Sequence, residues 1–160
     1  MSFSAYFESK RVKPEELSSF RTRIAGKTLA TINGSFDLMH AGHLEIIYAA
    51  SQQADILLVA LNSDASIQQY KSITRPIIPL EYRLRLMSAL AFVDYVTWFE
   101  ETDPRDFLRK VRPDVHVNGA DWGAECIEAP TCHEIGAALR IIPLVPGLST
   151  SSIIEKIKSL

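Results

Sequence analysis

Two histidines, His40 and His43, stand three residues apart in the segment His-Ala-Gly-His. On a helical turn, residues at positions i and i+3 lie on the same side, so both imidazoles face one point. Gly42 leaves room there for a phosphate, and the free N–H groups at a helix start attract anions. A neutral imidazole donates one hydrogen bond, and a protonated one adds a charge. The spacing therefore predicts a site for a polyphosphate chain.

The segment before this pair is typical of a turn between a strand and a helix, and it contains Gly34, Ser35 and Phe36. Asp37 lies one turn before His40, where it either orients a ligand or caps the helix start. A shared metal ion is the alternative use of the histidine pair, but no third Cys, Asp or Glu stands at a suitable spacing. We therefore expect no metal ion that the protein holds by itself.

Three basic residues follow the second expected strand. Lys71 and Arg75 lie in a polar, proline-bearing loop, and Arg83 lies on the next helix. Cations beside a phosphate chain stabilise its charge as that charge shifts during transfer. A solvated surface charge is the alternative for each of them, and Arg83 has Glu81 and Asp94 as further candidate partners.

Hydroxyl groups cluster near the C-terminus of the chain in Ser149, Thr150 and Ser151. A single Ser or Thr before a helix is most simply an N-cap. Several hydroxyls together at a helix start also form a phosphate site. We assign Thr150 and Ser151 to phosphates, and Ser149 to the cap or to backbone contacts.

Polar residues also follow two other expected strands. Asn62 and Asp64 follow the second strand, and Asp64 is expected to cap a short helix. Asn118, Gly119 and Asp121 follow the fourth strand. These positions are expected to contact the nucleotide or the second substrate.

Short apolar runs alternate with helical segments along the chain, which predicts a parallel sheet with helices on both faces. The strands are expected at residues 28–32, 56–61, 95–99, 115–117 and 140–145, and the helices at 14–25, 43–53, 64–70, 80–92, 104–111 and 151–160. This is a Rossmann-like, five-stranded parallel α/β sheet in a single domain over 1–160, with 1–27 as a helical lead-in. Ligands of such sheets bind at the carboxyl ends of the strands, where the strand order reverses.

The composition limits the class of partner. The chain of 160 residues has a formal net charge of −2, so it lacks the basic excess that binds nucleic acid. No apolar run approaches the ~20 residues of a membrane span, and residues 1–13 lack the apolar core of a signal peptide. We expect a cytoplasmic protein that binds small anionic molecules, and neither nucleic acid nor membrane. Cys126 and Cys132 are expected to be ordinary thiols.

On these motifs, residues 31–43 resemble the signature of the cytidylyltransferase-like nucleotidyltransferase superfamily. The resemblance continues through residues 54–71, 75–94, 118–122 and 147–154. The chain is most similar to bacterial heptose-phosphate adenylyltransferases, which make ADP-heptose for lipopolysaccharide. Glycerol-3-phosphate and ethanolamine-phosphate cytidylyltransferases share the core motifs but match the intervening runs less well.

The resemblance implies transfer of AMP from ATP to a sugar 1-phosphate, D-glycero-D-manno-heptose 1-phosphate, with release of pyrophosphate. It implies that His40, His43 and Lys71 are the catalytic contacts to the triphosphate, with Mg²⁺ held mainly by the nucleotide. The residues expected at the nucleotide are Gly34, Ser35, Phe36, Asp37, Gly42, Asn118, Gly119, Asp121, Ser149, Thr150 and Ser151. Those expected at the second substrate are Asn62, Asp64, Arg75 and Arg83. A homodimer is implied as well.

The chain departs from these relatives at Asn118. The adenylyltransferases usually carry Lys-Gly-Gly-Asp where this chain has Asn-Gly-Ala-Asp over residues 118–121. The missing lysine removes a positive charge near the nucleotide or the sugar phosphate, which bears on the substrate more than on the reaction. Two other functions stay open: a cytidylyltransferase that uses CTP with glycerol 3-phosphate or another alcohol phosphate, and a nucleotide-binding regulator without catalysis.

Overall fold

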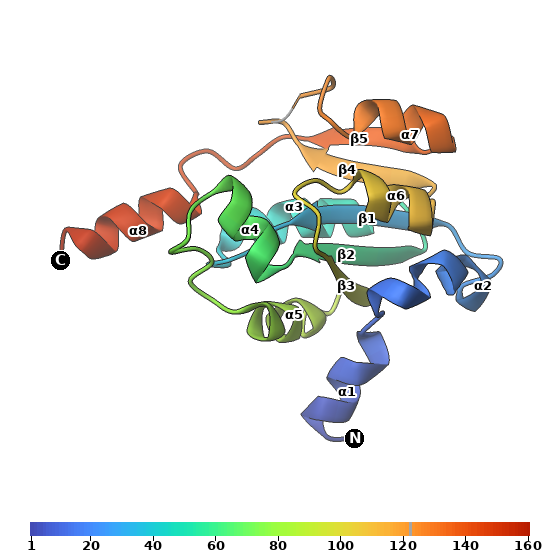
Figure 1. Ribbon diagram of the computed structural model, residues 1–160, viewed down its shortest axis with the longest axis horizontal. Coiled ribbons are helices and arrows are strands. Elements are labelled where there is room, and N and C mark those ends of the chain that lie inside the picture. Colours follow the sequence, from blue (N-terminus) through green and yellow to red (C-terminus); the bar gives the residue numbers. More distant parts are fainter. Residues whose placement is uncertain (122) are drawn as a thin grey trace.

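A five-stranded parallel sheet forms the centre of the computed structural model, which describes residues 1–121 and 123–160 (Figure 1). The strand order is β3-β2-β1-β4-β5. The strands are β1 (Leu29–Gly34), β2 (Ile56–Asn62), β3 (Tyr95–Phe99), β4 (Val115–Gly119) and β5 (Ala138–Ile142). Each adjacent pair is parallel, so the predicted Rossmann-like parallel sheet is confirmed.

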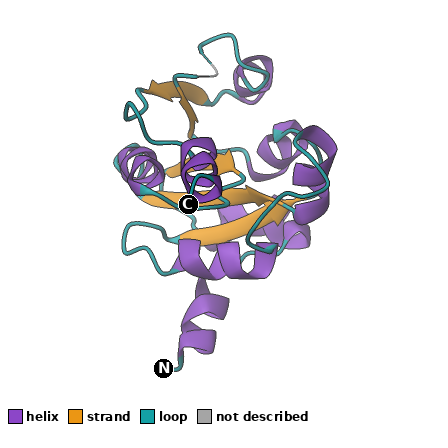
Figure 2. Cartoon of the chain, turned by 90° about the vertical axis from the view of Figure 1, so that its left-hand side faces the viewer, coloured by secondary structure: helices purple, strands orange, loops and turns teal. Residues whose placement is uncertain are grey.

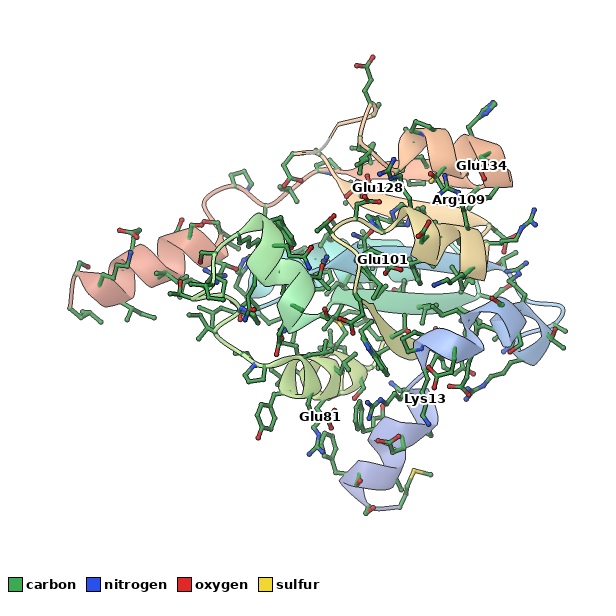
Figure 3. All side chains as sticks on the ribbon, viewed as in Figure 1. Lys13, Glu81, Glu101, Arg109, Glu128 and Glu134 are labelled. Carbon is green, nitrogen blue, oxygen red and sulfur yellow. The ribbon has the colours of Figure 1, made fainter. Side chains whose placement is uncertain are left out.

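Helices connect the strands and cover the sheet. They are α1 (Phe3–Lys10), the 3-10 helix η1 (Pro14–Ser19), α2 (Phe20–Arg23), α3 (Ala41–Ser51), α4 (Asp64–Tyr70), α5 (Leu80–Ser88), α6 (Arg105–Val111), α7 (Ala129–Ile135) and α8 (Thr150–Lys158). The pair Arg109–Glu134 joins α6 to α7 at 3.1 Å, and Figure 3 labels both side chains. Helix α8 projects away from the sheet in Figure 1, and none of its residues is buried.

Strand β2 shows why the sheet is covered on both faces. Every residue of β2 is buried. Leu57, Val59 and Leu61 belong to one apolar core, and Leu58 and Ala60 belong to the other. Because side chains alternate across a strand, each core occupies one face of the sheet. Residues of α3 and α5 complete the first core, and residues of α6 and α7 complete the second.

The N-terminal lead-in and the helix before β3 differ from the sequence expectation. The helix expected over 14–25 is the 3-10 helix η1 followed by the short α2, and α1 precedes both. The helix expected over 80–92 ends at Ser88. Leu90 and Phe92 still pack against the core, so their apolar spacing reflects burial in the turn that leads to β3.

Strand β5 and the cap of α4 also differ. The strand expected over 140–145 begins and ends earlier, and residues after it line the cavity described below. The N-cap of α4 is Ser63, whose hydroxyl accepts a backbone N–H of the first turn. Asp64 was expected there, but its carboxylate accepts a hydrogen bond from the Arg83 guanidinium instead.

Arg83 is completely buried and ties together four parts of the chain. Its Nη1 donates to the carbonyl oxygens of Ser35 at 2.7 Å and Asn62 at 2.9 Å. Its Nε donates to the carbonyl of Ile78 at 2.9 Å, and its Nη2 donates to Asp64 Oδ1 at 2.7 Å. The prediction that Arg83 contacts the second substrate is therefore corrected, because its side chain is 0% exposed and its donors are engaged inside the protein.

Figure 2 views the molecule from the side on which α8 lies. The loops after the strands gather at this edge of the sheet, because all five strands run in the same direction (Figure 1). In the described part of the chain, no helix combines the length and the apolar character that a bilayer span requires.

Replacing Arg83 tests its structural role. We expect Arg83→Met to lower the free energy of unfolding by about 3 kcal/mol, because three carbonyls and a carboxylate lose their donor. Urea denaturation measures this change. Arg85→Met on the same helix is the matched control, since Arg85 is 41% exposed and pairs with Glu81 on the surface. Such a pair contributes under ~1 kcal/mol. Equal losses in the two variants would contradict the assignment.

Candidate functional site

A cavity of about 890 Å³ opens at the carboxyl ends of the strands. It lies where the strand order reverses, since β1 pairs with β2 on one side and with β4 on the other. Of the residues that the sequence singled out, it brings together Gly34, Ser35, Phe36, His40, Gly42, His43, Asn62, Lys71, Asn118, Gly119, Asp121, Ser149 and Thr150. Residues from both ends of the chain thus share one cavity.

The two histidines stand at the start of α3. His40 is the N-cap residue, and the N–H of His43 donates to its carbonyl at 2.9 Å. The two rings are stacked, with centroids 3.9 Å apart and planes 20° apart. The Nδ1 atoms of both rings are buried and have no hydrogen-bond partner in the described part of the chain. A Cβ on Gly42 would lie 3.1 Å from the His40 ring, so the neighbouring side chains would have to shift by a few tenths of an ångström to admit one.

Burial keeps both imidazoles neutral. The pKa of His43 is lowered to about 4, mainly by burial and in addition by the neighbouring His40 and Lys71. Burial also lowers the pKa of His40. At pH 7 each ring is therefore a neutral hydrogen-bond donor and acceptor, and the site does not rely on imidazolium charge.

Lys71 supplies a positive charge to the cavity. It follows α4, and its Nζ donates to Ser35 Oγ at 3.1 Å. Burial lowers the pKa of Lys71, and the Arg75 guanidinium nearby lowers it further. The ammonium thus faces the loop that follows β1, on the same cavity as the histidines.

Asp37 and Arg75 form an ion pair outside the lining of the cavity. Arg75 Nη2 lies 2.8 Å from Asp37 Oδ2, and the N–H groups of Ile77 and Ile78 donate to the same carboxylate. Asp37 is 2% exposed and neither member of the pair lines the cavity. These contacts hold the 72–78 loop against the turn after β1, where ligand contacts were expected for Asp37 and Arg75. Asp64 does not line the cavity either, and its carboxylate accepts hydrogen bonds from the N–H of Leu80 and from the Arg83 guanidinium.

The start of α8 places its hydroxyl groups in different surroundings. The Ser149 hydroxyl caps the helix by accepting the N–H of Ser152 at 3.0 Å, as the sequence predicts. Ser149 and Thr150 line the cavity. Ser151 instead lines a smaller hollow of about 400 Å³ between α8 and the 72–77 loop. This geometry therefore does not support direct contact between Ser151 and a ligand in the main cavity.

The end of α4 and the loops after β3, β4 and β5 add residues that the sequence analysis missed. These lining residues are Tyr70, Thr102, Asp103, Pro104, Ile127, Glu128, Leu144, Val145 and Leu148. No local motif marks them, because they meet only through the tertiary fold. Trp122, considered for stacking on a base, lies outside the described residues. A Cβ on Gly119 would lie 2.5 Å from Asp121 Oδ1, so a side chain at 119 would displace that carboxylate.

Among the described residues, no group of three His, Cys, Asp or Glu side chains is placed to hold a metal ion. The cavity does contain single carboxylates, from Asp103, Asp121 and Glu128. A cation that enters with a polyphosphate would therefore take most of its ligands from the phosphate oxygens.

The chain is similar in sequence to known proteins. The sequence model of the family described as cytidylyltransferase-like matches residues 31–156. Bifunctional protein HldE of Campylobacter concisus is 40% identical over 158 residues, covering 98% of this chain and 33% of that protein. Bifunctional protein HldE of Syntrophotalea carbinolica is 40% identical over 136 residues, covering 84% of this chain and 28% of that protein. The chain thus spans about a third of the length of the curated relatives it matches.

Two solved structures are also similar. The lipopolysaccharide core biosynthesis protein of Thermoplasma volcanium has a TM-score of 0.61 and 26% identity, covering 75% of this chain and 98% of that one. The pantoate-beta-alanine ligase of Francisella tularensis has a TM-score of 0.65 and 14% identity, covering 94% of this chain and 78% of that one. The second likeness, at its low identity, shows the fold alone.

The neutral state of His43 is directly testable. We expect the ring resonances of His43 to titrate with a midpoint of about 4, against an ordinary value of 6.5, because burial disfavours the imidazolium. Two-dimensional NMR of the histidine rings measures the midpoint, and the spectrum of His43→Asn assigns the signal. A midpoint near 6.5 would contradict the geometry.

The same shift affects stability. His43 and His116 both have a pKa lowered to about 4 in the folded protein. The unfolded chain therefore binds more protons between pH ~6.5 and ~4. Stability is complete above this window, and we expect it to fall as the pH is lowered through it. Urea denaturation at a series of pH values checks the sign.

Proposed function

The chain belongs to the cytidylyltransferase-like family, and from this premise we propose that it transfers AMP from ATP to a sugar 1-phosphate, releasing pyrophosphate. The acceptor we propose is D-glycero-D-manno-heptose 1-phosphate. The observation that carries the proposal is the shared cavity of His40, His43, Lys71 and Thr150, which come from three separate segments. Neutral donors, one ammonium and a helix start together suit a triphosphate chain.

The reaction needs no covalent intermediate with the protein. An oxygen of the sugar phosphate attacks the α-phosphorus of ATP, the new O–P bond forms, and the bond from the α-phosphorus to the bridging oxygen breaks. The electron pair leaves with pyrophosphate. Since the attacking phosphate is already an anion, catalysis consists of positioning and charge stabilisation.

The proposed roles follow the lining of the cavity. The neutral His40 and His43 rings donate hydrogen bonds to the β and γ phosphates, and Lys71 offsets the charge that develops on the leaving group. Thr150 and the start of α8 bind the same chain of phosphates. Asn118, Gly119 and Asp121 are assigned to the nucleoside, and Asn62 to the acceptor. The backbone around Gly34, Ser35, Phe36 and Gly42 borders the phosphates.

A divalent cation fits this site as part of the nucleotide complex. The described residues lack a three-ligand metal group, but the cavity is open to a cation that the triphosphate chelates. Mg²⁺ is the ion we propose, and it would neutralise phosphate charge. A homodimer, a cytoplasmic location and a single domain over 1–160 stay predictions from the sequence.

Removing one imidazole tests the proposed chemistry. We expect His43→Ala to lower kcat about 100-fold, because a donor to the leaving phosphates is lost, while the urea midpoint at pH 8 stays close to that of the wild type. Pyrophosphate release from ATP and the heptose phosphate measures the rate. His133→Ala is the control, since His133 is an exposed histidine that does not line the cavity. Wild-type turnover in His43→Ala would refute the assignment.

The identity of the substrates is tested with a panel. ATP and CTP are each offered with heptose 1-phosphate, glycerol 3-phosphate and other phosphorylated acceptors, and pyrophosphate is measured. We expect ATP with the sugar phosphate to turn over fastest. Faster turnover of CTP with an alcohol phosphate would identify a cytidylyltransferase. ATP binding without any turnover would identify a regulator.

A further inference from the structure

Glu128 is a buried carboxylate for which the proposed reaction has no role. It precedes α7, is 5% exposed, and lines the cavity. Figure 3 labels it beside β4. Among the described residues, the Asn118 amide donates to Glu128 Oε2 at 3.2 Å, and no Lys, Arg or His forms an ion pair with it.

The groups that hydrogen-bond the Glu128 carboxylate are neutral, while the Arg105 guanidinium, which pairs with Asp103, acts on Glu128 only at longer range. Burial raises the pKa of the Cys126 thiol, and Glu128 raises it further, so the thiol stays protonated. Asn118 contributes one amide N–H, and its own Oδ1 accepts the N–H of Gly119 at 3.1 Å. A carboxylate has about four lone-pair sites, so an amide and a thiol leave part of its acceptor capacity unused.

A buried carboxylate without a cation is costly unless hydrogen-bond donors compensate it. Since Glu128 lines the cavity, its remaining acceptor sites are open to whatever the cavity binds. A phosphate would be repelled by this carboxylate. The complementary ligand group is a hydrogen-bond donor, and sugar hydroxyls are the donors that the proposed substrates carry in number.

The lining of the cavity indicates which substrate, the nucleotide or the sugar phosphate, would place its sugar near Glu128. On the side of β4 and β5, the apolar residues Ile127, Leu144, Val145 and Leu148 accompany Glu128. These suit the flat surface of a nucleotide base. On the side of β2, the polar residues Asn62 and Lys71 suit the phosphorylated acceptor. Glu128 therefore shares its side of the cavity with the residues suited to a base.

We propose that Glu128 accepts a hydrogen bond from a ribose hydroxyl of the nucleotide and thereby selects ribonucleotides over deoxynucleotides. This rests on the proposed function, because it assumes that the cavity binds ATP. It adds a specificity-determining residue that lies outside the histidine and hydroxyl motifs.

Isothermal titration of the wild-type protein with ATP, 2′-deoxy-ATP and 3′-deoxy-ATP tests the selection without any acceptor. We expect one of the deoxynucleotides to bind at least about tenfold more weakly than ATP, as a lost hydrogen bond to a charged group predicts. Equal affinity for all three nucleotides would overturn the proposal. This arm needs no variant, so it decides even if a substitution at 128 disturbs folding.

Glu128→Gln assigns the effect to this side chain. We expect the variant to bind ATP about tenfold more weakly and to lose most of the discrimination between ATP and the disfavoured deoxynucleotide. Glu125→Gln is the matched control, because Glu125 is an exposed glutamate of the same segment that does not line the cavity. An unchanged ATP affinity with a raised KM for the sugar phosphate would place the hydroxyl on the acceptor and overturn the ribose assignment.

Turnover of the wild-type protein separates the two proposals. Pyrophosphate release from ATP and the sugar phosphate, without discrimination between ribose and deoxyribose, would refute the role of Glu128 alone. Absence of ATP binding would refute both the role of Glu128 and the proposed function.

Discussion

The buried guanidinium of Arg83 is the interaction on which the site depends. It binds the carbonyl of Ser35 in the loop after β1 and the carbonyl of Asn62 at the end of β2. It also binds Asp64 at the start of α4. Parallel strands bring these segments to one edge of the sheet, where their carbonyl oxygens need hydrogen-bond donors. A single planar side chain with five N–H groups satisfies them together and so fixes the loops on which Ser35 and Lys71 stand.

The two histidines that line the cavity between these loops are uncharged. Stacking and burial hold His40 and His43 as uncharged donors beside one ammonium, that of Lys71. Several cations in an empty cavity would repel one another, and each buried cation would need an anionic partner. Neutral donors avoid both costs, and donors that are preorganised in a site still stabilise charge that develops in a transition state. The Asp37 carboxylate and the Arg75 guanidinium neutralise each other outside the lining of the cavity.

Local signals in the sequence predicted the sheet and the histidine pair, because their causes are local. The run of apolar residues in β2 indicates burial on both faces, and His-Ala-Gly-His indicates a helix start near a phosphate. The partners of Asp37 and Arg83 are not encoded nearby, since they depend on how the 72–78 loop and α4 fold back. Glu128 was missed for the same reason. A glutamate is an ordinary residue in the sequence, and only its burial in the folded protein is unusual.

The residue at position 118 determines how much of the Glu128 carboxylate is left for a ligand. An ammonium within reach of the Glu128 carboxylate would form an ion pair and occupy its oxygens, so the carboxylate would contribute little to a ligand. The amide of Asn118 donates one hydrogen bond and adds no charge. It therefore orients Glu128 without neutralising it. The Glu128 carboxylate therefore keeps acceptor sites toward the cavity, which suits a ligand group that donates hydrogen bonds.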